Sequence, residues 1–217
     1  LDVHTDEASF EIQYGNVTRP THYNTSWDFA RFEVCAHKWI DISENGYGIS
    51  VLNNCKYGCD IHNGEIGLTM LKSAVYPNPD ADKEHHSFTW SIAPHEGGWR
   101  EGNTVAKAYV LNNPYQTAVK ENEGGNLPAS YSFVQADKEN VVIEAVKKAE
   151  DSDAVIVRLY ECYNRRGQTT LTFPRPVKRA VICNMLEEEI GEVLNVNGSQ
   201  VELELKPYEI ETVKVEF

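Results

Sequence analysis

The sequence predicts an all-β protein, and three observations support this fold. Polar and apolar residues alternate along most of the apolar segments, as in FEIQY and YGISVL, and a period of two is typical of strands that bury one face. Turn signals such as Asn63-Gly64 and Asn197-Gly198 separate these segments. Only one segment has a helical period. At 217 residues and 41% hydrophobic content, the chain can form one large or two small domains with a proper core.

The first half contains five expected strands. In order, they are residues 10–14, 31–39, 47–52, 65–72 and 86–92. A short helix competes only at residues 103–113, where Val105, Ala108 and Tyr109 fit one helical face and Pro114 would end it.

The polar, glycine-containing stretch ENEGGNLP at residues 121–128 has no apolar period and is typical of a linker or long crossing loop. We therefore expect two domains, residues 1–125 and 126–217. The second contains expected strands at residues 140–146, 154–161, 168–173, 178–184, 201–205 and 210–217. Asn197-Gly198 is expected to form a type I′ hairpin turn, so this domain should be a small antiparallel β-sandwich.

The net charge of −13 disfavours nucleic acid and anionic membrane as partners, because both repel an acidic surface, whereas neutral ligands such as sugars remain open. No apolar run approaches the roughly 18 residues of a membrane span, and the N-terminal residues lack the pattern of a signal peptide. We therefore expect a cytoplasmic protein. The five cysteines are expected to be reduced thiols.

The stretch LNNCKYGCD, residues 52–60, carries most of the candidate chemistry. Cys55 and Cys59, with the nearby His62, offer soft ligands to zinc, but a structural zinc site needs four ligands and no fourth is evident. We expect these three to be core or turn residues, with no metal site and no catalytic residue in the chain.

The amides and tyrosine of the same stretch suit a sugar as well as a turn. Asn53, Asn54, Lys56 and Tyr57 supply donors, acceptors and an apolar face for sugar hydroxyls. The same amides could instead cap a turn and bond its backbone. Both interpretations stay open.

Four segments resemble one family. LNNCKYGCDI, the long stretch from EIGLTMLK to APHEGGW, NVVIEAVKKAEDSDAVIVRLYE and KPYEIETVKVEF are similar, in this order, to the C-terminal β portion of α-mannosidases of glycoside hydrolase family 38, in its cytosolic and bacterial branch. The resemblance extends from about residue 31 to residue 217.

The resemblance implies a large retaining enzyme in which an N-terminal catalytic α/β barrel holds zinc and the aspartate nucleophile, followed by helices and β-sandwiches. Residues 31–98 would be part of a galactose-mutarotase-like supersandwich, and residues 133–217 the small terminal β-sandwich. His4 and Asp6 have the spacing of the family's metal motif but lack its apolar, tryptophan-containing surroundings. We therefore expect no cofactor in this chain, and a scaffold whose partners are the catalytic domain of the same polypeptide and a mannoside.

By position in the family, residues of the turn and of the loop at 72–82 are candidates for the rim of the substrate pocket. They are Asn53, Asn54, Lys56, Tyr57, Lys72, Tyr76, Asp80 and Asp82. The chain departs from the family at Asn54, where an aspartate often stands.

Two alternatives have different consequences. A free-standing carbohydrate-binding β-sandwich would expose aromatic platforms such as Trp90, Trp99 and Tyr76, whereas a scaffold would bury Trp90 and Trp99. An epimerase of the mutarotase type would need a histidine and a carboxylate converging in a pocket, and no spacing singles out such a pair.

Overall fold

The structure, a computed structural model, describes residues 1–119, 124–126 and 128–217. The chain divides into two compact units, Leu1–Thr117 and Ala118–Phe217. Half of the linker expected at residues 121–128 lies outside the described residues. Among those residues, no helix has the length and apolar character needed to cross a membrane.

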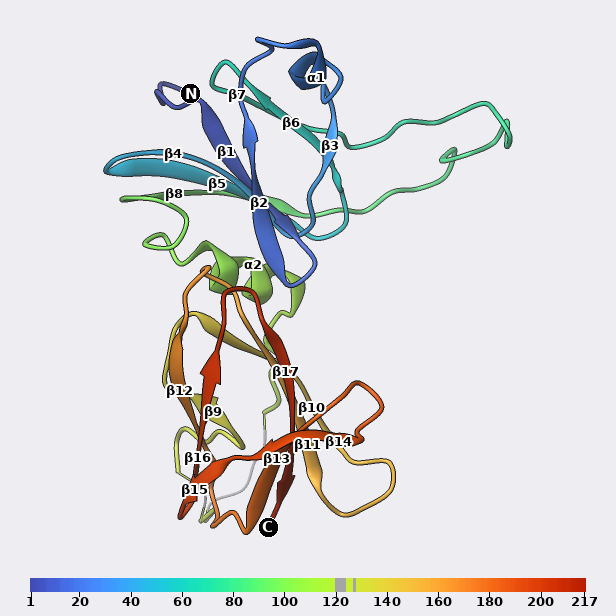
Figure 1. Ribbon diagram of the computed structural model, residues 1–217. Helices are drawn as coiled ribbons and strands as arrows, with labels where there is room; N and C mark the ends of the chain where they lie inside the picture. The colour runs from blue at the N-terminus through green and yellow to red at the C-terminus, as the bar shows by residue number, and fades with distance from the viewer. Residues whose placement is uncertain (120–123, 127) are drawn as a thin grey trace. The chain divides into compact units, whose positions relative to one another are not determined.

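Unit 1 contains two antiparallel sheets (Figure 1). The larger has the order β2-β1-β4-β5-β8 and the smaller the order β3-β6-β7. The strands are β1 (Glu7–Ile12), β2 (Gly15–Pro20), β3 (Val34–Cys35), β4 (Trp39–Glu44), β5 (Tyr47–Asn53), β6 (Gly58–His62), β7 (Glu65–Leu68) and β8 (Trp90–His95). The prediction of an all-β fold is confirmed.

The two faces of the larger sheet have different partners. One face packs on the smaller sheet through a core that contains Phe10, Ile40, Ile42 and Ile61, each at most 5% exposed. The opposite face lies under helix α2 (Thr104–Asn112), which contacts β4 and β5. This helix confirms the competing helical pattern at residues 103–113; a second, four-residue helix, α1 (Ser26–Phe29), was not predicted.

The strand predicted at residues 31–39 is wrong, because this segment changes sheets. Its N-H groups find partners on both sides: Ala36 donates to Tyr57 O, and His37 donates to Glu11 O. Val34–Cys35 therefore pairs in the smaller sheet, while the strand that begins at Trp39 pairs in the larger one.

Other expected strands are displaced. The strand predicted at residues 10–14 lies at Glu7–Ile12, because Tyr14 adopts a positive φ of 57° in the turn that follows. The strand predicted at 65–72 ends at Leu68, and the one predicted at 86–92 begins only at Trp90. Strands β2 and β6 were not predicted, and β6 starts at Gly58.

Unit 2 is a sandwich of two antiparallel sheets with the orders β10-β11-β17-β13-β14 and β15-β16-β12-β9. The strands are β9 (Gln135–Ala136), β10 (Val141–Lys148), β11 (Val155–Glu161), β12 (Gly167–Thr172), β13 (Arg179–Cys183), β14 (Glu189–Val193), β15 (Asn195–Asn197), β16 (Gln200–Leu205) and β17 (Ile210–Glu216). Both sheets contribute to one core, in which Leu159, Leu171, Val201 and Val213 are fully buried.

The hairpin expected at Asn197-Gly198 exists, but its turn differs from the predicted type I′. Asn197 pairs with Gln200, so Gly198 and Ser199 are the central residues, and of these two only Gly198 has a positive φ. That combination is typical of a type II′ turn. The type I′ geometry occurs instead between β6 and β7, where Asn63 and Gly64 have φ values of 49° and 75°.

Candidate functional site

The turn after β5 is organised by the side chain of Asn53. Its Oδ1 accepts from the backbone N-H groups of Cys55 at 3.1 Å and Lys56 at 2.7 Å, and its Nδ2 donates to His37 O at 2.7 Å. The residue is only 3% exposed. Its amide is therefore engaged by backbone, as in an Asx turn.

The same turn anchors one end of a long excursion of the chain. Asn54 donates its backbone N-H to Thr89 O at 3.1 Å and accepts the Thr89 N-H on its side-chain Oδ1 at 2.9 Å. The Lys56 ammonium lies 5.1 Å from the centre of the Phe88 ring. These contacts fix the segment that leads into β8.

Glu33 anchors the other end. Its carboxylate accepts from the hydroxyl of Thr69 and forms an ion pair with Lys72, and Thr69 N-H donates to Gly58 O at 2.8 Å. The hydrogen bonds from Lys72 and Thr69 lower the pKa of Glu33. Both ends of the excursion therefore start from fixed points.

Between these anchors, residues 69–89 form an arm that extends away from the strands of unit 1 (Figure 1). The arm has no regular secondary structure, and its length exceeds that of an ordinary connection, which is typical of loops with a function. Tyr76 is 87% exposed, Asp80 forms an exposed ion pair with Lys83 at 3.2 Å, and Asp82 is exposed.

Seven of the eight rim candidates fall into three groups, and Tyr57 stands apart. Asn53 is buried in the turn, Asn54, Lys56 and Lys72 fasten the base of the arm, and Tyr76, Asp80 and Asp82 lie on the arm itself. Tyr57 is 49% exposed and lies edge-on against the ring of His37. The sequence placed the turn and the loop in one region without showing that the turn holds the loop.

The residues considered as zinc ligands do not converge. Cys55 is exposed in the turn, Cys59 is buried on β6 with Sγ donating to Val34 O, and His62 stacks on Tyr23 with 3.8 Å between ring centres. Burial raises the pKa of Cys59 to about 12. Across the described residues, no three His, Cys, Asp or Glu side chains form a group that could hold a metal ion.

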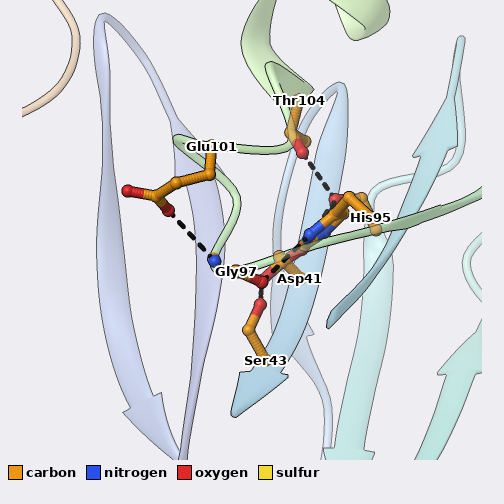
Figure 2. Close-up of polar contacts among 8 residues, drawn as sticks. Asp41, Ser43, His95, Gly97, Glu101 and Thr104 are labelled. Atoms are coloured by element: carbon orange, nitrogen blue, oxygen red, sulfur yellow. Dashed lines mark hydrogen bonds and ion pairs between the residues drawn. The ribbon is translucent and has the colours of Figure 1, made fainter. Parts of the chain in front are cut away.

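A second cluster, which sequence reasoning missed, lies on the α2 face of the larger sheet. Figure 2 shows the His95 ring directed at Asp41, with Ser43 and Thr104 nearby. His95 Nε2 lies 2.7 Å from Asp41 Oδ2, while Ser50 Oγ lies 2.6 Å from the same oxygen. The side chains of His95 and Asp41 are 3% and 2% exposed.

Register explains how the ring reaches the carboxylate. Ser43, Gly48 and His95 face one another across β4, β5 and β8. A Cβ on Gly48 would collide with the His95 ring, and a Cβ on Gly102 would lie 2.5 Å from its Cγ. Glycine at both positions therefore makes the space that the imidazole fills, and Gly48 within an alternating strand was the available sequence signal.

Both ring nitrogens of His95 have partners. Nε2 faces the Asp41 carboxylate and Nδ1 faces Gly97 O at 3.2 Å, and both of these groups only accept. The Ser50 Oγ also lies 3.1 Å from Nε2, so the ring is held through both of its nitrogens. Thr104 and Ser50 complete the cluster, with 2.6 Å between their oxygens.

Aspartate, histidine and serine meet here, yet the arrangement does not suit nucleophilic catalysis. Ser50 is fully buried, and its hydroxyl lies 2.6 Å from both Asp41 Oδ2 and Thr104 Oγ1, so it is not presented to a substrate. The cluster instead fastens the segment from Gly97 to Thr104, and with it the start of α2, to the sheet. The convergent pair required by the mutarotase alternative exists, but inside the core.

The tryptophans give a divided result. Trp99 is 5% exposed, and its ring centre lies 5.0 Å from that of Trp39, so it is not an exposed platform. Trp90 is 49% exposed and lines a groove of about 600 Å³ together with Ile92 and Leu68.

Two family descriptions match the sequence. Residues 1–80 match "Glycosyl hydrolases family 38 C-terminal domain", and residues 140–213 match "Glycosyl hydrolases family 38 C-terminal beta sandwich domain".

Similar proteins include Alpha-mannosidase G of Dictyostelium discoideum, 38% identical over 98% of this chain, and Alpha-mannosidase 2C1 of Homo sapiens, 36% identical over 96%. The chain spans about a fifth of each relative's length. A crystal structure described as an alpha-mannosidase from Enterococcus faecalis V583 superposes with a TM-score of 0.78, at 19% identity, over 97% of this chain and 24% of that one. At this identity the superposition concerns the fold alone.

Proposed function

The chain belongs to glycosyl hydrolases family 38 through its C-terminal domains, and on that premise we propose that it is the non-catalytic β region of an α-mannosidase that hydrolyses terminal α-mannosides. The main support is the pair of alignments with α-mannosidases, which include nearly all of this chain but leave about four fifths of each relative outside. The rest of such a protein has ample length for a catalytic domain.

We assign the hydrolysis of the mannoside to the rest of the polypeptide, outside this chain. A retaining glycosidase needs two carboxyl groups about 5 Å apart beside the scissile bond, and the buried Asp41 is engaged by His95 and two serines. We place the zinc ion and both catalytic carboxyl groups in the N-terminal domain, and assign no residue of this chain to zinc. The present chain would act as a scaffold for that domain.

The arm at residues 69–89 is the part of the scaffold proposed to reach the rim of the substrate pocket. Its base is anchored at Glu33 and Asn54, and it presents Tyr76, Asp80 and Asp82 to solvent. Asn53 would contribute only indirectly, because its amide holds the turn. We further propose a cytoplasmic location, since the five cysteines form no disulfide with one another.

Hydrolysis of an aryl α-mannoside tests the proposal. The 217-residue chain, with and without added zinc or cobalt, is compared with a longer protein that includes the preceding domain. Turnover by the longer protein alone is expected. Metal-dependent turnover by the 217 residues would overturn the assignment.

A carbohydrate-binding module remains the second candidate, because Trp90 is half exposed in its groove. Titration of methyl α-mannoside against the 217-residue chain, followed by tryptophan fluorescence, separates the two. Saturable quenching that is lost in Trp90→Ala would favour the module, and an unchanged spectrum is expected for the scaffold.

A further inference from the structure

One side of the unit 1 sandwich is open. β7 is the last strand of the smaller sheet and β8 the last strand of the larger one. The groove of about 600 Å³ lies between them, with residues of both strands in its wall. On the other side, β3 and β6 belong to a core that is closed by β1 and β4.

The face exposed in the groove continues the core face of the larger sheet. Ile40 and Ile42 on β4 are at most 2% exposed, whereas Trp90 and Ile92 on β8 are 49% and 56% exposed. Ile92 pairs directly with Val51, which also lines the groove. The larger sheet thus carries core-like apolar side chains as far as its last strand, β8. The smaller sheet, which covers this face, ends at β7 and leaves β8 uncovered.

The groove has the chemistry of a protein core. Its wall includes Ile66, Leu68 and Met70 opposite Trp90 and Ile92, and Glu65 supplies the only charged side chain among its lining residues. Specific sugar sites need several convergent polar groups, and this lining does not offer them. An apolar polypeptide surface fits it better.

β7 also offers backbone hydrogen bonds. It pairs with β6 along one edge, and no strand of the described residues pairs with its other edge. An unpaired edge beside an apolar face accepts an extended segment whose alternate side chains point inward. Such a strand would lie over Trp90 and Ile92 and close the sandwich.

The N-terminal end of the chain lies at this edge. The Leu1 nitrogen donates to Gly64 O at 2.7 Å, just before β7 begins, and Leu1 lines the groove. Polypeptide joined to Leu1 and running back along β7 would be antiparallel to it. Both matched families are C-terminal domains, and about four fifths of each relative lies outside the match.

We propose that an extended segment of the polypeptide preceding Leu1 in the whole protein adds to the free edge of β7 as an antiparallel strand and covers Trp90 and Ile92. This inference rests on the proposed function, since it needs the longer protein, and it identifies the surface by which the scaffold joins the rest.

Hydrogen exchange of β7 and β8 in the 217-residue chain and in the longer protein tests the inference. We expect the β7 amides at residues 65–68 to exchange at least tenfold more slowly in the longer protein. Ile92→Glu should remove that protection in the longer protein without lowering the melting temperature of the 217-residue chain. Ile190→Glu is the matched control, because Ile190 is 68% exposed on β14, the last strand of a sheet in unit 2.

Equal exchange of β7 in both proteins would overturn the inference, and so would an equal loss of protection with Ile190→Glu. A third contrary result would be protection of β7 that rises with concentration in the 217-residue chain while that chain sediments as a dimer. That result would identify a second copy of the chain as the occupant. Aryl α-mannoside hydrolysis separates this inference from the proposed function. An active longer protein with unprotected β7 refutes only the strand, and an inactive one with protected β7 refutes only the mannosidase assignment.

Discussion

At the scale of single residues, unit 1 depends on a buried carboxylate, Asp41, that has several polar partners. His95 Nε2 lies 2.7 Å from Asp41 Oδ2 and His95 Nδ1 lies 3.2 Å from Gly97 O, while Ser43 and Ser50 donate to the same carboxylate. A buried ion pair adds little compared with an apolar core, but loss of one partner strands the other charge.

His95→Ala is therefore expected to destabilise unit 1 by about 3–5 kcal/mol, because the Asp41 carboxylate keeps its burial and loses its histidine partner. Urea unfolding followed by tryptophan fluorescence measures this, since Trp39 and Trp99 lie in unit 1. His85→Ala, at an exposed position, should change stability by less than about 0.5 kcal/mol. Equal effects of the two changes would contradict the assignment.

Cys59 has a different signature, because burial raises its pKa to about 12. Iodoacetamide reacts with thiolates, so at pH 8 it should modify the exposed Cys35 and Cys55 and spare Cys59 in the folded chain. The raised pKa stabilises the fold fully below the unfolded value of about 8.5, and this contribution falls as pH rises from there towards about 12. Mass spectrometry of the labelled peptides gives the result; modification of Cys59 at the rate of Cys55 would refute its burial.

At the scale of elements, the arm depends on the turn that precedes it in sequence. Asn54→Ala removes the acceptor for Thr89 N-H and should cost about 1 kcal/mol locally. We expect faster hydrogen exchange at residues 86–89, faster tryptic cleavage at Lys83, and an unchanged unfolding midpoint. Asn54→Asp keeps the acceptor oxygen and should retain the anchoring, which makes it the matched control. If both variants exchange alike, the side chain does not hold the arm.

The sequence predicted such elements where local pattern and environment agree. Tyr47–Asn53 and Val155–Glu161 were predicted nearly at their observed limits, because each is a continuous, largely buried strand that stays in one sheet. The prediction of one strand at residues 31–39 was wrong, because the alternation of polar and apolar residues continues where the chain changes sheets at Ala36 and His37. The turn at Gly198 was assigned the wrong type because the pairing partners of a strand are not visible in its sequence.

The same limit applied to the candidate sites. The sequence of LNNCKYGCD showed which side chains can form hydrogen bonds, but not their partners. In the structure Asn53 accepts from backbone N-H groups of its own turn, and Asn54 accepts from Thr89, 35 residues away. His95 and Asp41 are 54 residues apart and meet only through the register of three strands. Long-range pairing of this kind cannot be derived from spacing.

At the scale of the whole molecule, the two units differ in how completely their cores are covered. Unit 2 has a continuous core from both of its sheets, with Leu159, Leu171 and Val215 fully buried. Unit 1 leaves Trp90 and Ile92 half exposed in its groove. Closure of one unit and openness of the other lead to different behaviour when the units are separated.

Residues 118–217 alone should fold and unfold in one cooperative urea transition, because the core of unit 2 is built from its own two sheets. Glu161 gives a test of that cooperativity: its fully buried carboxylate accepts from Asn140 Nδ2 and from the N-H groups of Tyr163 and Tyr208. Glu161→Ala leaves these three donors without their acceptor, so it should lower stability by about 3 kcal/mol.

The control for that change is Glu192→Ala at an exposed position, which should have an effect below about 0.5 kcal/mol.

Residues 1–117 alone should instead bind a hydrophobic dye at the groove, and Ile92→Glu should reduce the dye signal by interrupting the apolar wall. A gradual, non-cooperative transition for residues 118–217 would show that the core of unit 2 is not complete by itself. Equal dye binding by the two separated units would show that unit 1 is no more open than unit 2.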